Sequence, residues 1–164
     1  MAIITLNNNS LSGVTALPAG VGGKVLQVVQ TEFATNIATS STSYVDSGIS
    51  ASITPTSTSN KIYISAVAGG TTYATDGYLD ISLYSQINGG GYSSIQPDNT
   101  SNPFQKIKNA SIIFYIPMII NYLYSPSTTS QVDIKVYIKS VTGSTQYVSE
   151  ADRIATLTLM EIAG

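Results

Sequence analysis

The segment from Val132 to Lys139 constrains the fold most strongly, because its residues alternate strictly between apolar and polar. Successive side chains of a β-strand point to opposite faces of a sheet. A period of two therefore predicts a strand with one face on a core and the other in water. A helix would instead scatter these side chains around its axis. The same alternation recurs over shorter stretches at residues 49–53, 62–67 and 79–84.

The composition agrees with an all-β chain. Ser and Thr together number 42, and Ile, Val and Thr together number 50, whereas the charged residues number 16. β-Branched residues favour strands, while Ser and Thr favour turns and exposed strand faces. No run of ten residues has a helical apolar stripe, and no repeat occurs at a fixed period. We therefore predict one antiparallel domain over residues 24–164, a sandwich or a barrel.

Turn residues divide this domain. The run from Asn88 to Gly91 supplies the positive φ angles of a hairpin. Residues 96–109 form the longest stretch with a loop composition, and Pro117 predicts a bulge or an edge strand because it lacks a ladder donor. Residues 112–116 are apolar on both faces, which places them in the middle of the core or at a subunit interface. Further strands are predicted at residues 24–30, 92–95 and 154–162.

Residues 1–23 differ from the rest because they contain no charged residue. Their apolar side chains follow neither a helical period nor a sustained period of two, yet disordered tails are usually polar and charged. We interpret this segment as an extended arm that lies on a partner surface. The alternative is a first strand of the same domain followed by a loop. The predicted partner-binding residues are Ile3, Ile4, Leu6, Leu11, Val14 and Leu17.

The residue types that are missing exclude much chemistry. The chain has no His, Cys or Trp, so it has no histidine base, thiolate nucleophile, disulfide or imidazole metal site. Its acidic residues are scattered, and Asp80 and Asp133 occupy outward positions of alternating strands, where a solvated charge is expected. We therefore expect no enzyme activity, no catalytic residue, no metal and no cofactor.

The charge balance and the apolar runs bear on the partners. A net charge of −2 is far from the basic stripe that a nucleic acid requires, so we expect no nucleic-acid partner. The most apolar stretch, residues 112–124, is too short to cross a bilayer, and no basic leader precedes an early apolar run. We expect neither a membrane segment nor a secretion signal.

The 11 tyrosines can be interpreted in two ways. Tyrosine can line sugar-binding or protein-binding surfaces, because it has a large rigid face with a polar tip. On an antiparallel sheet, however, tyrosines are also ordinary half-buried strand residues. One aromatic cluster is the best candidate for subunit contacts, and it comprises Phe114, Tyr115, Met118, Tyr122 and Tyr124.

Four segments carry a resemblance: GKVLQVVQ at 23–30, STSYVDSGISASITPTSTSNKIYI at 41–64, SPSTTSQVDIKVYIKS at 125–140 and TLTLMEIAG at 156–164. In order and spacing they resemble small virion structural proteins of tailed phages, many of them marine or cyanobacterial, which are commonly labelled tail-fibre or structural proteins. The resemblance implies a jelly-roll-like β-sandwich that trimerises on the outside of a virion. It carries over no catalytic or metal position.

Two functions are expected from this combination. The first is a homotrimeric exterior capsid decoration or cement protein, or a short head fibre, which binds the major capsid protein or another virion protein with its arm as the anchor. The weak contacts made by many copies would then add up to stable attachment. The alternative is a receptor-binding tail-fibre protein that binds host cell-surface glycan through Tyr, Ser, Thr and Asn side chains.

Overall fold

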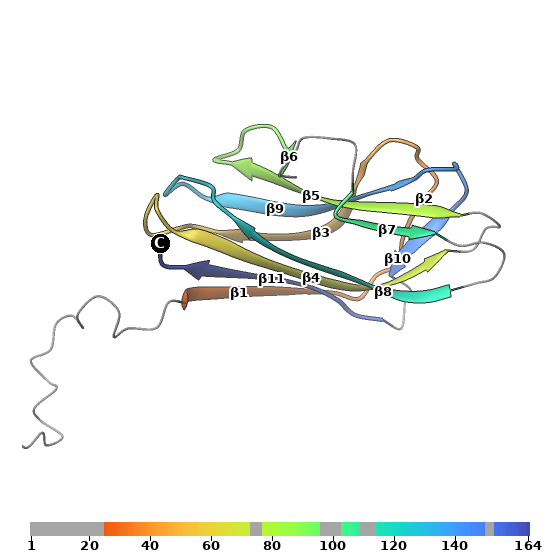
Figure 1. The fold of residues 1–164 in the computed structure, drawn as a ribbon, viewed down its shortest axis with the longest axis horizontal. Coiled ribbons are helices and arrows are strands. Elements are labelled where there is room, and N and C mark those ends of the chain that lie inside the picture. The colour runs from red at the N-terminus through yellow and green to blue at the C-terminus, as the bar shows by residue number, and fades with distance from the viewer. Residues whose placement is uncertain (1–24, 73–76, 96–102, 109–113, 150–152) are drawn as a thin grey trace, which may run out of the picture.

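The computed structural model describes residues 25–72, 77–95, 103–108, 114–149 and 153–164. Within these ranges all regular structure is β, and two antiparallel sheets face each other (Figure 1). The all-β antiparallel sandwich predicted from the sequence is therefore confirmed. The strands are β1 (Val25–Phe33), β2 (Ile37–Thr39), β3 (Val45–Ile53), β4 (Lys61–Thr72), β5 (Tyr78–Ile87), β6 (Ser93–Ser94), β7 (Gln105–Lys108), β8 (Phe114–Tyr124), β9 (Val132–Ser140), β10 (Gln146–Ser149) and β11 (Ala155–Ile162).

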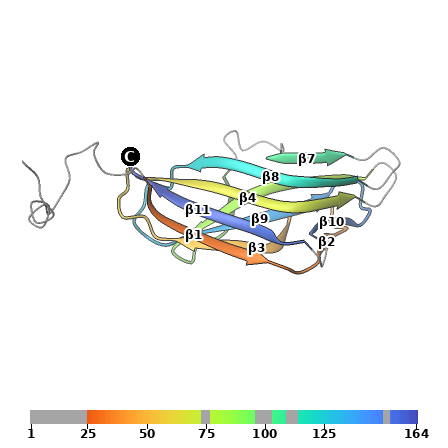
Figure 2. The same ribbon diagram turned by 90° about the horizontal axis from the view of Figure 1, so that it is seen from below.

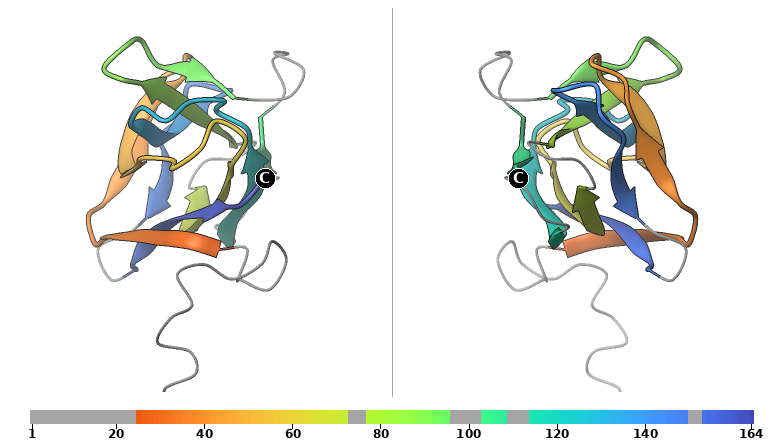
Figure 3. Two further views of the ribbon diagram at one scale, coloured as in Figure 1. Left: turned by 90° about the vertical axis from the view of Figure 1, so that its left-hand side faces the viewer. Right: turned by 90° about the vertical axis from the view of Figure 1, so that its right-hand side faces the viewer.

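The two layers are seen end-on in Figure 3. Sheet A has the order β1-β11-β4-β10-β2, and β8 pairs with the other side of β4. Sheet B has the order β3-β9-β5-β6, and β7 also pairs with β5. The chain crosses repeatedly between the sheets, because β3, β5 and β9 lie in sheet B while β4, β8 and β10 lie in sheet A. These crossings give the sandwich its jelly-roll-like character.

The core lies between the layers and follows the alternation of the strands. Along β9 every second residue is buried, beginning with Val132, as the sequence predicts. Along β11 the inward positions begin with Ala155 and end with a carboxylate, Glu161. Aliphatic side chains dominate, and the largest fully buried ones are Ile49, Ile53, Ile62, Ile64, Leu79, Ile81, Leu83, Met118, Ile134, Ile138, Leu157 and Leu159.

Side chains join the two sheets at both long edges. On one edge Gln27 of β1 donates from Nε2 to the carbonyl oxygen of Thr54 at 2.7 Å, and Thr31 Oγ1 donates to the carbonyl oxygen of Ser50 at 2.8 Å. On the other edge Gln105 of β7 bonds the backbone of β8. These bonds satisfy polar groups that would otherwise be left open at strand edges.

The structure confirms the predicted hairpin and corrects the predicted loop. Asn88 and Gly89 have φ angles of 50° and 74°, and Gly90 N–H donates to the carbonyl oxygen of Ile87 at 3.0 Å. Within residues 96–109, however, β7 forms and pairs with β5. Its four residues contain one buried aliphatic side chain, Ile107, and pairing with β5 supplies the stability that composition alone does not indicate.

Candidate binding surfaces

The described side chains of the predicted subunit-contact cluster on β8, those of Met118, Tyr122 and Tyr124, face inward. Met118 is 0% exposed, so its side chain belongs to the core of this chain, which corrects the expectation of a subunit contact there. Tyr122 and Tyr124 are half-buried against the same core. The rings of Tyr122 and Phe104 meet edge to face with centroids 5.0 Å apart.

The other cluster members are placed only in part. The hydroxyl of Tyr124 lies 3.1 Å from Ser85 Oγ of sheet B, which ties this tyrosine to the opposite layer. Phe114 and Tyr115 pair through their backbones with Thr72 and Thr71 of β4, and their side chains lie outside the described residues. The arm residues Ile3, Ile4, Leu6, Leu11, Val14 and Leu17 also lie outside them. The position of the arm thus stays a prediction.

The opposite face of β8 is the exposed one. Ile119 is 53% exposed and Leu123 is 46% exposed, both on the outside of sheet A. The run is apolar at both parities, so alternation alone does not tell which side faces out. Asn121 is the one signal, because it shares the parity of Ile119 and Leu123 and a polar residue favours the outward side.

Strand register turns these exposed residues into a continuous apolar row across sheet A. Leu123 lies opposite Tyr63, and Tyr63 lies opposite Met160. Met160 in turn lies opposite Val28 of β1, which is 55% exposed. The row therefore crosses β8, β4, β11 and β1, the four strands that run side by side in Figure 2. We call the side chains of Leu123, Tyr63, Met160 and Val28 the apolar row.

A second exposed pair extends this surface. Four residues further along β4 than Tyr63, Val67 is 39% exposed and lies opposite Ile119. A polar row separates the two apolar sets, consisting of Asn121, Ser65, Thr158 and Gln30. Apolar side chains at this density on one outer sheet face are typical of a surface that another protein covers.

The outer face of sheet B has a different character, because its side chains cover one another. Tyr84 and Tyr137 stack with centroids 4.0 Å apart. Lys135 Nζ lies 4.7 Å from the ring centroid of Tyr92, and Lys139 Nζ lies 4.6 Å from that of Tyr44. Ring faces that a carbohydrate would need for stacking are thus occupied by lysines or by another ring. These contacts therefore give no support to the prediction that tyrosines bind a glycan.

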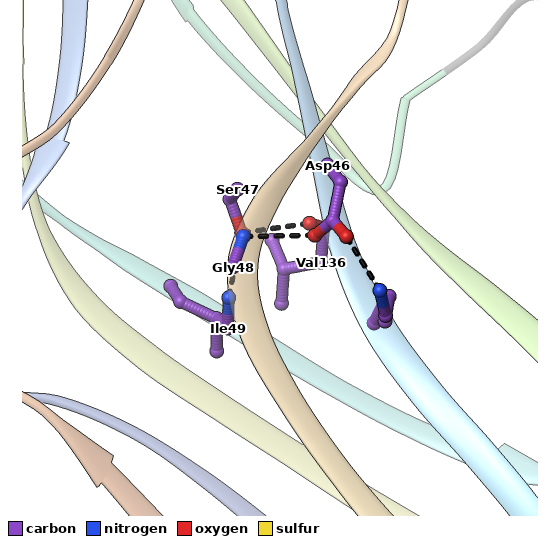
Figure 4. Close-up of polar contacts among 6 residues, drawn as sticks. Asp46, Ser47, Gly48, Ile49 and Val136 are labelled. Atoms are coloured by element: carbon purple, nitrogen blue, oxygen red, sulfur yellow. Dashed lines mark hydrogen bonds and ion pairs between the residues drawn. The ribbon is translucent and has the colours of Figure 1, made fainter.

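A bulge in β3 positions Asp46, the acidic residue that pairs with Lys135 on the outer face of sheet B (Figure 4). Asp46 pairs with Tyr137 and Ser50 pairs with Lys135, so residues 47–49 all stand opposite Val136 alone. Gly48 has a φ of 83°, and its N–H donates to Asp46 Oδ1 at 2.8 Å. Within the same bulge Ser47 Oγ donates to the carbonyl oxygen of Val136 at 2.7 Å.

The bulge brings the Asp46 carboxylate onto Lys135. The distance from Lys135 Nζ to Asp46 Oδ2 is 2.5 Å. This hydrogen bond raises the pKa of Lys135 above its ordinary value. The lysine therefore stays charged and is already paired, which leaves it little capacity to recruit an anionic ligand.

Asp80 departs from the sequence expectation of a solvated charge. Its residue is 2% exposed, and it lies between Lys106 Nζ at 3.8 Å and Lys139 Nζ at 3.6 Å. The alternation does place it on the outer face, but Lys139 and Tyr44 cover it. Burial, followed by the nearby charge of Asp80, raises the pKa of Tyr44, so that tyrosine stays protonated.

A second buried carboxylate, Glu161, lies near the C-terminal end of β11 at an inward-facing position, and this residue is 0% exposed. Its Oε1 accepts hydrogen bonds from Thr56 N at 2.6 Å, Thr56 Oγ1 at 2.8 Å and Asn60 Nδ2 at 2.6 Å. Its Oε2 accepts one from Gln27 Nε2 at 2.6 Å. Burial alone would raise the pKa of Glu161, but the hydrogen bonds from Asn60, Thr56 and Gln27 outweigh it and lower the pKa to about 2.

These contacts explain both buried acids as parts of the scaffold. Within the described ranges, no three acidic residues converge on a point that could hold a metal ion. The same part of the chain forms no helix that is long and apolar enough to span a bilayer. Because Val28, Ile119 and Leu123 are exposed there, the outer face of sheet A is the described surface that we consider for contact with another macromolecule.

Comparisons with known proteins give a distant similarity in shape. No family model and no curated protein matches the chain. Among solved structures it is similar to the VP2 subviral particle of infectious bursal disease virus, with 14% identity and a TM-score of 0.48 over 84% of this chain and 33% of that chain. It is also similar to the Gx strain structure of the same virus, with 12% identity and a TM-score of 0.43 over 84% and 37% of the two chains. The chain spans about a third of the length of these viral chains.

Proposed function

We propose that this protein is a virion structural protein, an exterior capsid decoration or cement protein or a short head fibre, that works by binding copies of itself and a larger protein shell. The observation that carries the proposal is the exposed apolar surface of sheet A, with Val28, Ile119 and Leu123 each about half exposed. The sequence resemblance to small virion proteins of tailed phages points to the same function.

The contrast between the two outer faces supports this proposal. On sheet B, lysines, aspartates and tyrosines pair with one another. On the described outer face of sheet A, the charged residues are Lys61, Glu32 and Arg153, whose side chain lies against Gly69, and the residues of the rows that cross β8, β4, β11 and β1 between them are apolar or uncharged. Such a face suits partners that are recognised by apolar burial and shape. Several copies in one oligomer, expected to be a homotrimer, would raise the effective concentration of weak contacts with the shell.

The test combines the oligomeric state with particle binding. The purified full chain is expected to form an oligomer in size-exclusion chromatography with light scattering, and to sediment with purified capsids of the phage that encodes it. Replacing Leu123 with Asp should weaken both, and the matched change Ser52→Asp on the exposed outer side of β3 should weaken neither. A monomer that does not bind capsids would contradict the proposal. Saturable binding to host polysaccharide would favour a receptor-binding tail protein.

A further inference from the structure

We infer that the N-terminal arm of one copy docks on the outer face of sheet A of a second copy, across the apolar row of Leu123, Tyr63, Met160 and Val28. This inference rests on the proposed function, because it names the partner of the arm within the oligomer. It assigns the exposed surface one occupant, residues 1–23 of a neighbouring chain. The arm thereby contacts another copy before any contact with the shell.

The place where the arm joins the sandwich carries the first step. Residue 24 leads into Val25 at the start of β1, and Val25 and Leu26 are each 48% exposed. Val28, the β1 member of the apolar row, follows only three positions later. The arm is therefore joined to β1 close to the exposed apolar row.

The chemistry of the arm matches that surface. Residues 1–23 contain no charge and seven spaced aliphatic side chains, the six named above and Val21. The surface alternates between apolar sets and the uncharged polar row of Asn121, Ser65, Thr158 and Gln30. An uncharged peptide with Asn, Ser and Thr between its aliphatic residues can bury the apolar sets and hydrogen-bond the polar row. A charged tail would lose hydration on the same surface.

The length of the arm favours a neighbouring chain over its own. Four strands about 4.8 Å apart make a face roughly 19 Å wide, which an extended chain crosses in about six residues. An arm of 23 residues reaches up to about 80 Å when extended. An arm of this length is therefore long enough to extend past its own face to the same face of a neighbouring copy. Head-to-tail contacts of this kind form a ring when the rotation between copies closes, as it would in the expected trimer.

Cross-linking tests this inference directly, because the chain contains no cysteine and background labelling is therefore absent. One preparation of the full chain carries a single change in the arm, Ile4→Cys, Leu11→Cys or Leu17→Cys. The second carries Leu123→Cys, and a matched control carries Ser52→Cys on sheet B. The two preparations are mixed, allowed to exchange subunits and treated with a short bis-maleimide. We expect a covalent pair of chains with Leu123→Cys and none with Ser52→Cys.

Other outcomes overturn the inference in distinguishable ways. A cross-link that forms only within one chain carrying both Ile4→Cys and Leu123→Cys would show that the arm covers its own face. An oligomer that survives deletion of residues 1–20 without any arm cross-link would show that a different segment covers the row. In both cases the proposed virion function stands. A wild-type monomer that ignores capsids would instead remove the proposed function together with the inference.

Substitution on the receiving surface gives a second measurement. Leu123→Asp places a charge where the arm buries an aliphatic side chain, so we expect the dissociation constant of the oligomer to rise at least about 100-fold. Deletion of residues 1–20 should have a similar effect and should leave the far-ultraviolet circular dichroism unchanged, since β1 begins at Val25. An unchanged dissociation constant in either variant would contradict arm docking.

Discussion

At the scale of single residues, Glu161 links segments that are far apart in the sequence. Its carboxylate accepts hydrogen bonds from Gln27 on β1 and from Thr56 and Asn60 in the connection between β3 and β4. An amide in place of the carboxylate turns one acceptor into a donor that faces other donors. We expect Glu161→Gln to lower the free energy of unfolding by about 3 kcal/mol, measured by urea denaturation. The exposed control Glu32→Gln should change it by less than about 0.5 kcal/mol.

The same residue predicts how stability depends on pH. The pKa of Glu161 is about 2 in the folded chain, against an ordinary value of 4.5. A lowered folded-state pKa contributes stability above the unfolded value, and that stability is lost as the pH falls. The wild type should lose about 3 kcal/mol between pH 5 and pH 2 through this group. The Glu161→Gln variant should show a flatter acid limb, and parallel curves for the two proteins would contradict this role.

Single residues also show where sequence interpretation stops. Alternation placed Asp80 on the outer face correctly, yet its burial depends on Tyr44, which comes from a separate segment, and on Lys139 of β9. Met118 looked like a contact residue because β8 is apolar at both parities, and only pairing with β4 fixes it in the core. Periodicity assigns a face, whereas burial on that face depends on neighbours that are distant in sequence.

At the scale of elements, the bulge in β3 depends on Gly48. Its φ of 83° is strained for any residue with a Cβ, although nothing lies within 4 Å of an added Cβ. We expect Gly48→Ala to cost about 1 kcal/mol of stability through backbone strain alone. The matched control is Gly91→Ala, where there is open space and no positive φ, and its effect should be under about 0.5 kcal/mol. Equal effects in thermal unfolding would contradict a conformational role for Gly48.

The edge of β8 gives a prediction about local protection. Ile119 N–H donates to Gln105 Oε1 at 3.0 Å, so a side chain from sheet B stands in for a neighbouring strand at this point. Replacing Gln105 with Ala should speed hydrogen exchange at the amide of Ile119. The amide of Ile120, a residue that pairs with Ala66 of β4, should keep its protection. The surface change Gln131→Ala should alter neither amide. Equal acceleration at both amides after Gln105→Ala would mean that the whole strand has loosened.

Most long strands could be predicted from the sequence, because each carries its own alternation over several residues. β9 and β5 are of this kind, and Pro117 correctly marked β8 as an edge strand. The missed elements, β2, β7 and β10, have three or four residues and too few apolar side chains to make a pattern. β10 pairs with β4, β2 pairs with β10 and β7 pairs with β5, and this pairing cannot be read from the local sequence.

At the scale of the whole molecule, the outer faces of the two sheets differ in how far their side chains are covered. Sheet B covers its outer face with its own tyrosines and lysines, so it gains little from a partner. Sheet A leaves its apolar row in water, where the hydrophobic effect favours any arrangement that covers it. The candidate surface could not be predicted from the sequence, because a row that crosses four strands exists only once the register is known.

The proposed oligomerisation through this face predicts that stability depends on concentration. Association of folded chains stabilises them by mass action, so the melting temperature of the wild type should rise with protein concentration. We expect Leu123→Asp to remove the proposed association and to leave the core unchanged, because Leu123 is 46% exposed and points away from the core. Its melting temperature should therefore be independent of concentration and equal to that of the wild type at high dilution. Differential scanning calorimetry over a wide concentration range checks this, and a wild-type melting temperature that ignores concentration would count against assembly through sheet A.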